Sequence, residues 1–328
     1  MVIFEAPLTP KRGVRALAFG SCRVTNPIIA LRNRGDLKIC AWGLDAHHTA
    51  PEGLQSLRVV TGELRIPDAL SPYIFETETT PPVDKVQEWV RAGIDVFVLE
   101  VSTDQQFCFG EYLLQQNFVA RRLVHPHRGV LLDWYRTVCR GEAPSEECVQ
   151  AALEKFRAGG AEPRLEFIEL LRGVRLKTQD SVEITGALGR MMSRFGGRWL
   201  VVGPFEIPGQ EGAIMKDRRL LNATLAEAAG KCGAIFYDPT HLVVEHGAGT
   251  ALDGGGADIY EYAPSFYPTV GENLVRLVRQ LHPVGRRIPR EPPPAKPSPS
   301  PKSSPTPKNL YAVVKRSLAR RTRKWRGR

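Results

Sequence analysis

Short apolar runs that each end at a glycine or a small polar residue constrain this chain more than any other feature. They cover 14–19, 37–42, 94–101, 199–202 and 234–237. Stretches with helical spacing of apolar residues lie between and after them, at 28–34, 84–92, 218–231 and 270–281. Strands that alternate with helices form parallel sheets covered on both faces. The pattern therefore predicts a three-layer α/β/α fold with a mostly parallel sheet.

Two stretches depart from this alternation. Residues from about 111 to 195 show helical spacing of apolar residues, so we expect a helical insertion within the domain that spans 1–282. Residues 44–83 are rich in proline and polar residues and show little periodicity, which predicts mostly loop. The histidine pairs at 47–48 and at 125 and 127 lack acidic or cysteine partners at ligand spacing, so we expect surface loops and no metal site.

Beyond residue 282 the composition changes. Residues 283–308 hold ten prolines, which predicts an extended linker. Residues 309–328 carry eight basic side chains, no acid and a modest apolar stripe, which predicts a disordered basic tail with amphipathic helical character. The net charge of +10 falls to −3 for residues 1–282 alone. We therefore expect the tail, and not the body, to meet an anionic partner. A membrane surface is favoured over nucleic acid, and a tail that only aids solubility is the third interpretation.

Composition further limits the class of protein to which this chain can belong. With 42% hydrophobic residues the chain can build a sizeable core. It has no apolar run long enough to span a membrane and no signal peptide at its start, so we expect a cytoplasmic protein, held peripherally at the inner membrane face if the tail binds there. Six cysteines are scattered without a Cys-x-x-Cys pair and are expected to be reduced thiols. No cofactor is implied.

The residues that follow the strands carry the chemistry, because ligands of open α/β sheets bind at the carboxyl ends of the strands. Gly20-Ser21-Cys22-Arg23 follows the first strand and Asp238-Pro239-Thr240-His241 follows the last. A nucleophilic serine needs a base and a group that orients that base. Ser21, His241 and Asp238 are candidates for these three roles. Ordinary turn chemistry also accounts for both blocks, and Cys22 is expected to pack rather than react.

This order of blocks resembles the SGNH/GDSL-like hydrolases, in a variant whose first block reads Gly-Ser-Cys and which is linked to bacterial surface polysaccharides. The resemblance implies an SGNH- or flavodoxin-like sheet and a nucleophilic Ser21, with His241 as base and Asp238 as its orienting carboxylate. The amides of Ser21 and Gly43 would be oxyanion donors. The family's third block supplies an asparagine that is missing here, and Ser102 is the candidate substitute. Arg23 would bind an anionic substrate or reach solvent.

A second candidate for the last block lies nearer the final helix, at Asp258 to Tyr262. There Glu261 takes the place of the histidine, and a block at that position would make the body catalytically degenerate. The resemblance thus implies a serine esterase or O-acyltransferase acting on a small-molecule, glycan or glycolipid acyl substrate. The alternative is a non-catalytic member of the fold that binds a polar ligand, with the basic tail recruiting it to anionic membrane or nucleic acid.

Overall fold

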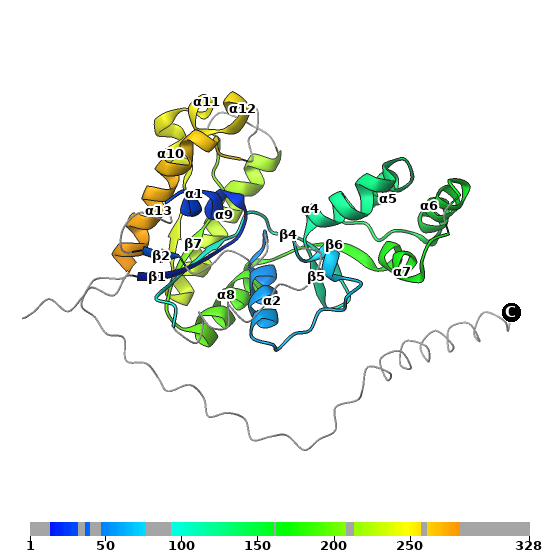
Figure 1. The fold of residues 1–328 in the computed structure, drawn as a ribbon, viewed down its shortest axis with the longest axis horizontal. Coiled ribbons are helices and arrows are strands. Elements are labelled where there is room, and N and C mark those ends of the chain that lie inside the picture. The colour runs from blue at the N-terminus through cyan, green and yellow to red at the C-terminus, as the bar shows by residue number, and fades with distance from the viewer. Residues whose placement is uncertain are drawn as a thin grey trace, which may run out of the picture. The chain divides into compact units, whose positions relative to one another are not determined.

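Five parallel strands form the central sheet (Figure 1). The computed structural model describes residues 14–31, 37–39, 47–76, 93–160, 162–207, 213–256 and 261–281. The strands are β1 (Val14–Phe19), β2 (Leu37–Ile39), β3 (Val96–Glu100), β7 (Arg198–Val202) and β8 (Ile235–Tyr237). Their order is β2-β1-β3-β7-β8, and every neighbouring pair is parallel. The parallel sheet predicted from the apolar runs is confirmed.

Helices cover both faces of this sheet, because successive strand residues point to opposite sides. Ala16 and Ala18 of β1 join a core with helices α1 (Cys22–Ala30) and α13 (Tyr267–Leu281). Leu17 and Phe19 join a second core on the other face. The helices of that face are α2 (Ala50–Val60), α8 (Ser181–Phe195) and α9 (Ala213–Cys232). The α/β/α layering predicted from the sequence is therefore confirmed.

A second lobe, residues 105–178, has its own sheet, and its core also takes in buried residues between 59 and 75. Its antiparallel strands are β4 (Gln105–Phe109), β5 (Tyr112–Leu114) and β6 (Val174–Thr178), in the order β5-β4-β6. Its helices are α4 (Gln116–Phe118), α5 (Arg128–Cys139), α6 (Glu146–Ala158) and α7 (Leu165–Gly173), with the π-helix Val119–Val124 and the 3-10 helix His125–His127. Trp134 and Phe107 lie fully buried in its core.

The stretch 111–195, predicted to be a helical insertion, is mostly helical but differs from that prediction in two details. Strands β5 and β6 lie within that stretch, and α8 packs against the parallel sheet and not in the second lobe. Each of these strands has only three to five residues, too few for a period-2 pattern to stand out between helices.

The prediction of mostly loop over 44–83 missed helix α2, which begins at Ala50. Thr49 caps it by accepting a hydrogen bond from the Glu52 amide, 3.2 Å away. The helix buries polar and small residues such as Gly53 and Gln55 beside Leu57, which obscures the apolar spacing. Similarly, α1 begins at Cys22 with Ser21 as its cap and Pro27 inside it, earlier than the helical spacing from residue 28 predicted.

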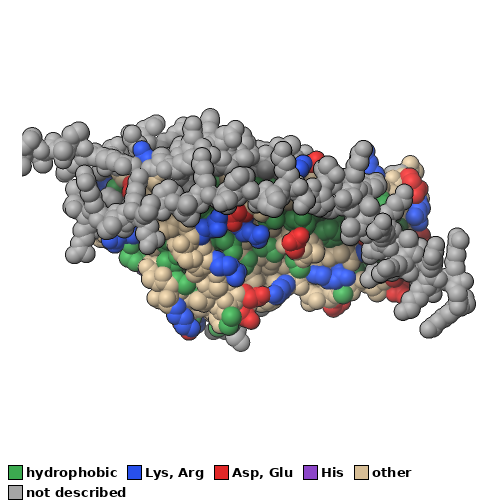
Figure 2. All heavy atoms as spheres, turned by 90° about the horizontal axis from the view of Figure 1, so that it is seen from below, with side chains coloured by type: hydrophobic (Ala, Val, Ile, Leu, Met, Phe, Trp, Pro, Cys, Tyr) green, Lys and Arg blue, Asp and Glu red, His purple; other side chains and the backbone are tan. Residues whose placement is uncertain are grey.

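Shorter helices complete the described part of the chain: Ser71–Tyr73, α10 (Thr240–His246), α11 (Ala248–Ala251), α12 (Asp253–Gly256) and Pro264–Phe266. Within the described residues no helix is both long and apolar enough to cross a membrane. Wherever described residues are visible in Figure 2, basic and acidic side chains are interspersed. Gly43, Asp258, the predicted helix 84–92, the linker 283–308 and the tail 309–328 lie outside the described residues.

Candidate active site

The carboxyl ends of four parallel strands meet at one pocket. Arg23 reaches it from just beyond β1, Glu100 is the last residue of β3, and Gly203 and Pro239 follow β7 and β8. Aromatic and aliphatic side chains complete the lining: Val24, Val202, Phe205, Tyr237, Tyr262, Val270 and Leu274. The Tyr237 hydroxyl is buried and has no hydrogen-bond partner among the described residues. Strand ends of this kind are where open α/β sheets bind ligands.

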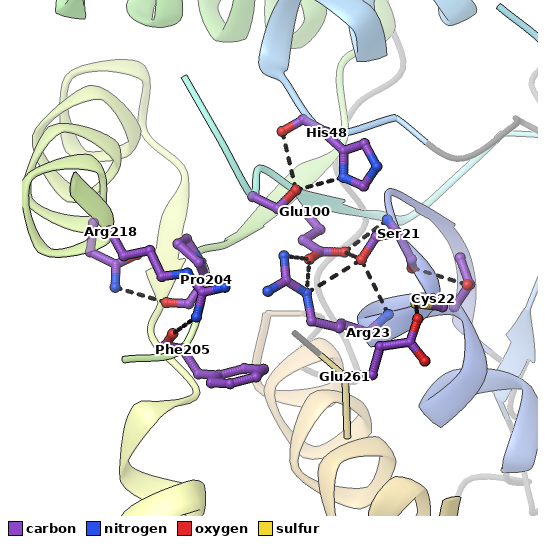
Figure 3. A network of polar contacts seen from close by, with 12 residues as sticks. Ser21, Cys22, Arg23, His48, Glu100, Pro204, Phe205, Arg218 and Glu261 are labelled. Carbon is purple, nitrogen blue, oxygen red and sulfur yellow. Dashed lines mark hydrogen bonds and ion pairs between the residues drawn. The ribbon is translucent and has the colours of Figure 1, made fainter. Parts of the chain in front are cut away.

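Ser21, Arg23 and Glu100 form what we call the ionic cluster (Figure 3). The Ser21 hydroxyl donates to Glu100 Oε2 at 2.6 Å, and the Ser21 amide donates to the same oxygen at 2.8 Å. Arg23 pairs with Glu100 Oε1 through Nε at 2.8 Å and Nη2 at 2.7 Å. The exposed fractions are 5% for Ser21, 9% for Arg23 and 1% for Glu100. The carboxylate thus has four donors in place of water, which is what burying a charge requires.

Gly20 allows this approach of β1 to β3. Its φ is +145°, and a Cβ built there would lie 2.6 Å from the Glu100 Cβ. Any other residue would push Glu100 away from Ser21, so the glycine is needed for close packing as well as for the turn. Ser21 then caps α1, its hydroxyl accepting from the Arg23 amide at 3.2 Å.

Strand β8 and the block that follows it border the same pocket, through Tyr237 and Pro239 respectively. His241 is exposed, and its Nδ1 lies 3.1 Å from the backbone carbonyl of Asp238. A carbonyl only accepts, so Nδ1 carries a proton and donates it to this carbonyl, which leaves Nε2 as the nitrogen that can exchange a proton with a substrate. The Asp238 carboxylate instead accepts from the amide and hydroxyl of Thr240. The carbonyl of Asp238, and not its carboxylate, orients the imidazole.

Cys22 and Glu261 meet beside the first turn of α1. The Cys22 thiol donates to Glu261 Oε1 at 3.4 Å. Burial, with the nearby Glu261 and Glu100 carboxylates, raises the pKa of Cys22 to about 12. The thiol therefore stays protonated at neutral pH and is a poor nucleophile. Glu261, the candidate of the alternative last block, is exposed and contacts the residue next to Ser21.

A hydrogen-bonded pair, the imidazole of His48 and the hydroxyl of Ser102, lies at the end of β3. Nδ1 of His48 is 2.8 Å from the Ser102 hydroxyl, and Nε2 is 3.2 Å from Asn117 Nδ2 in the second lobe. Burial lowers the pKa of His48 to about 4, and the Glu100 and Arg23 charges also act on it. The expectation that residues 47–48 form a surface loop is wrong, since His47 is 2% exposed and His48 is only partly exposed.

A buried polar network holds His48 in place. The His48 amide donates to Glu52 Oε2 at 2.7 Å, and Gln106 Nε2 donates to Glu52 Oε1 at 2.9 Å. Thr49 and Gln179 both donate to Gln106 Oε1. Burial raises the pKa of Glu52 to about 8, so this carboxyl is neutral at pH 7. The network joins α2 to β4 and thereby fixes the segment that carries His48.

The structure brings some of the predicted site residues together and leaves others apart. Ser21 and Arg23 meet at Glu100, and Ser102 lies two residues beyond it. Within the described residues no hydrogen bond joins Ser21 to His241. Sequence reasoning missed Glu100 and His48. The available signals were an acid at the end of an otherwise apolar strand and the Thr49 to Glu52 capping-box spacing.

Two comparisons with known proteins extend this picture. A family model described as the TviD N-terminal domain matches residues 14–277. The Vi polysaccharide biosynthesis protein TviD of Salmonella typhi is 22% identical to this chain over 261 residues. That match covers 76% of this chain and 30% of the relative. The chain thus spans less than a third of the length of the curated relative it matches.

Proposed function

Because the chain belongs to the TviD N-terminal domain family, we propose that it modifies acyl esters on a bacterial polysaccharide or on its glycolipid precursor. The polysaccharide part of the proposal comes from the name of the relative, a Vi polysaccharide biosynthesis protein. The proposed acyl chemistry comes from Ser21 and His241, which follow β1 and β8 at the carboxyl edge of the sheet. In its finer form the proposal is an SGNH-like serine esterase or O-acyltransferase with Ser21 as nucleophile.

One observation carries the proposal: the residues after β1 and the residues after β8 border a single pocket. Arg23 and Pro239 both line it, and they lie two residues along the chain from Ser21 and His241 respectively. The sheet order β2-β1-β3-β7-β8 puts these blocks at the same edge although they lie far apart in sequence. The buried hydroxyl of Tyr237 supports a polar ligand there, because a buried donor without a partner costs free energy that a ligand can recover.

The proposed reaction runs in two balanced steps. Ser21 Oγ attacks the acyl carbonyl, and His241 Nε2 accepts the hydroxyl proton and passes it to the alcohol that leaves. A water molecule or a sugar hydroxyl then attacks the acyl-serine and gives its proton to His241, which passes it to Ser21 Oγ as the bond from Oγ to the acyl carbon breaks. Before the first step the Ser21 hydroxyl must exchange its Glu100 acceptor for the imidazole. Arg23 keeps Glu100 in place during that exchange.

A specific observation favours a second candidate, a non-catalytic binding protein of the same fold. Both donors of Ser21 are already taken up by Glu100 Oε2, and the ionic cluster is at least nine-tenths buried. In such a protein Ser21 only caps α1 and holds Glu100. The pocket would then bind an acylated glycan without cleaving it.

The substitution Ser21→Ala separates the two candidates. We expect the wild-type chain to hydrolyse an aryl acetate and the variant to lose at least about a thousandfold in kcat, because the acyl-enzyme cannot form. Ser145→Ala is the matched control, since Ser145 caps α6 by accepting from the Cys148 amide. It removes a helix cap of the same kind outside the pocket and should leave kcat unchanged.

The same assay tests the last block through His241→Ala beside Glu261→Gln. Loss of a general base costs about a hundredfold to ten-thousandfold, and we expect that loss only for His241→Ala. Loss only for Glu261→Gln would move the block to residues 258–261. Absence of turnover in the wild-type chain, with equal polysaccharide binding by wild type and Ser21→Ala, would establish the binding protein instead.

A further inference from the structure

The hydrogen bonds around His48 determine which of its nitrogens carries the proton. Asn117 Nδ2 donates to Nε2 at 3.2 Å, so Nε2 supplies the lone pair. Nδ1 therefore carries the proton and donates it to the Ser102 hydroxyl at 2.8 Å. This order of donors makes the Ser102 oxygen an acceptor within the pair. The hydroxyl proton of Ser102 must point elsewhere.

That proton has no strong acceptor within the described residues. The nearest is the backbone carbonyl of His48, 3.5 Å from the Ser102 oxygen. This carbonyl already accepts the Ser102 amide at 2.8 Å and the Thr103 amide at 3.2 Å. A third bond at 3.5 Å is at the limit of hydrogen-bond length. Ser102 thus presents a hydroxyl proton that is ready for a ligand oxygen.

The ionic cluster creates a need for such a donor. In serine acyl transfer the carbonyl oxygen gains negative charge and is stabilised by preorganised donors, one of which is commonly a backbone amide. Here the amide of Ser21 is already bound to Glu100 Oε2 at 2.8 Å. Ser102 lies two residues beyond Glu100 on the same chain segment. Residues two apart in an extended segment point to the same side.

We propose that Ser102 donates its hydroxyl proton to the carbonyl oxygen of the acyl substrate, and that His48 is the positioning residue that turns this proton outward. The inference rests on the proposed function and adds to it a donor that the Ser21 amide cannot supply. Since burial keeps the pKa of His48 at about 4, the imidazole is neutral at working pH. It acts through its Nδ1 proton and takes no proton from the substrate.

Asn117→Asp reverses the order of donors and acceptors around His48 and is the sharpest test. A carboxylate only accepts, so in the neutral imidazole, at an assay pH of about 8, Nε2 carries the proton, Nδ1 becomes the acceptor, and the Ser102 hydroxyl turns inward. We expect kcat for aryl acetate hydrolysis to fall about a hundredfold, as for loss of one oxyanion donor, with KM little changed. Asn273→Asp on α13 adds the same charge at a position that does not line the pocket and should leave kcat unchanged. A rise in kcat for Asn117→Asp would overturn the inference, since it would make Ser102 and His48 a nucleophile and base.

Substitutions of His48 distinguish positioning from proton transfer. His48→Asn keeps a neutral N–H close to the position of Nδ1, whereas His48→Leu removes it. We expect His48→Asn to retain kcat within about tenfold and His48→Leu to match Ser102→Ala, about a hundredfold down. Equal inactivation by His48→Asn and His48→Leu would contradict a positioning role and make His48 a base.

A readout without turnover tests the proton position on His48 separately from the proposed function. Imidazole nitrogen NMR, assigned with His48→Asn, should show the wild-type proton on Nδ1 and the Asn117→Asp proton on Nε2. A wild-type proton on Nε2 would overturn the inference whatever the activity. If Ser102→Ala loses turnover while Ser21→Ala keeps it, the nucleophile proposal fails and the donor stands. If instead Ser21→Ala loses turnover while Ser102→Ala keeps it, Ser102 is not the donor and the proposed function stands.

Discussion

Two hydroxyl-bearing sites lie at the same sheet edge and differ in how their hydrogen bonds are satisfied. In the ionic cluster both donors of Ser21 and two nitrogens of Arg23 are bound to the two oxygens of Glu100. In the pair of His48 and Ser102 the hydroxyl proton has, among the described residues, only a carbonyl at 3.5 Å as acceptor. We call the ionic cluster the closed site, because both donors of Ser21 are bound; it stabilises the contact of β1, β3 and α1. We call the pair of His48 and Ser102 the open site, because its hydroxyl proton can donate to a ligand. A substrate must therefore displace Glu100 from the Ser21 hydroxyl before Ser21 can react, whereas the Ser102 hydroxyl loses only a long hydrogen bond.

The largest expected effect is on stability and comes from breaking the ionic cluster on one side. Glu100→Leu leaves the Arg23 guanidinium buried without its carboxylate and should lower the free energy of unfolding by about 3–5 kcal/mol. Replacing both partners, Glu100→Leu with Arg23→Met, should recover much of that loss. Arg172→Met, which breaks an exposed ion pair with Glu146, is the control and should cost less than about 1 kcal/mol. Urea unfolding measures wild type and all three variants. A loss under about 1 kcal/mol for Glu100→Leu would mean that the cluster is not buried as described.

The neutral network behind His48 gives a smaller, pH-dependent effect. The pKa of Glu52 is raised from 4.5 to about 8 by burial, so between these values the folded state holds a proton that the unfolded state has lost, and stability falls as pH rises. The pKa of His48 is lowered from 6.5 to about 4, so stability falls as pH drops through that window. The two slopes oppose each other from pH 4.5 to 6.5, and above 6.5 only the Glu52 slope remains.

The measurement is the difference in unfolding free energy between wild type and Glu52→Gln at several pH values. From pH 6.5 to 8 the wild-type chain should lose about 2 kcal/mol more than the variant. Ser102→Ala, which leaves Glu52 in place, is the control and should keep the wild-type slope. Parallel curves for wild type and Glu52→Gln would show that Glu52 is ionised in the folded protein at pH 7.

The two sites also differ in how far the sequence alone predicts them. The closed site follows β1, whose apolar run ends at Gly20, so the position of Ser21 at the sheet edge follows from the sequence pattern. The role of Glu100 there does not, because its contact with Ser21 spans 79 residues and depends on the strand order. The open site is hidden, since α2 buries polar residues that obscure its apolar spacing. Local periodicity predicts elements that bury apolar faces and misses those held by buried polar networks.

The second lobe shows the same limit. Its helices are predictable from their apolar spacing, but its three strands, of three to five residues each, pair across up to 73 positions of sequence. No local pattern marks such pairs. Because Asn117 of this lobe binds His48, the part of the fold that is hardest to predict is also the part that sets the proton position at the open site.

The central claim is that acyl chemistry takes place on Ser21. Its most direct test is to quench the reaction of the full chain with an aryl acetate and to measure the intact mass, followed by peptide mapping. We expect one acetyl group on the peptide that contains Ser21, no such adduct in Ser21→Ala, and a normal adduct in Ser145→Ala. An acetyl group on Ser102, or turnover in Ser21→Ala, would contradict this claim.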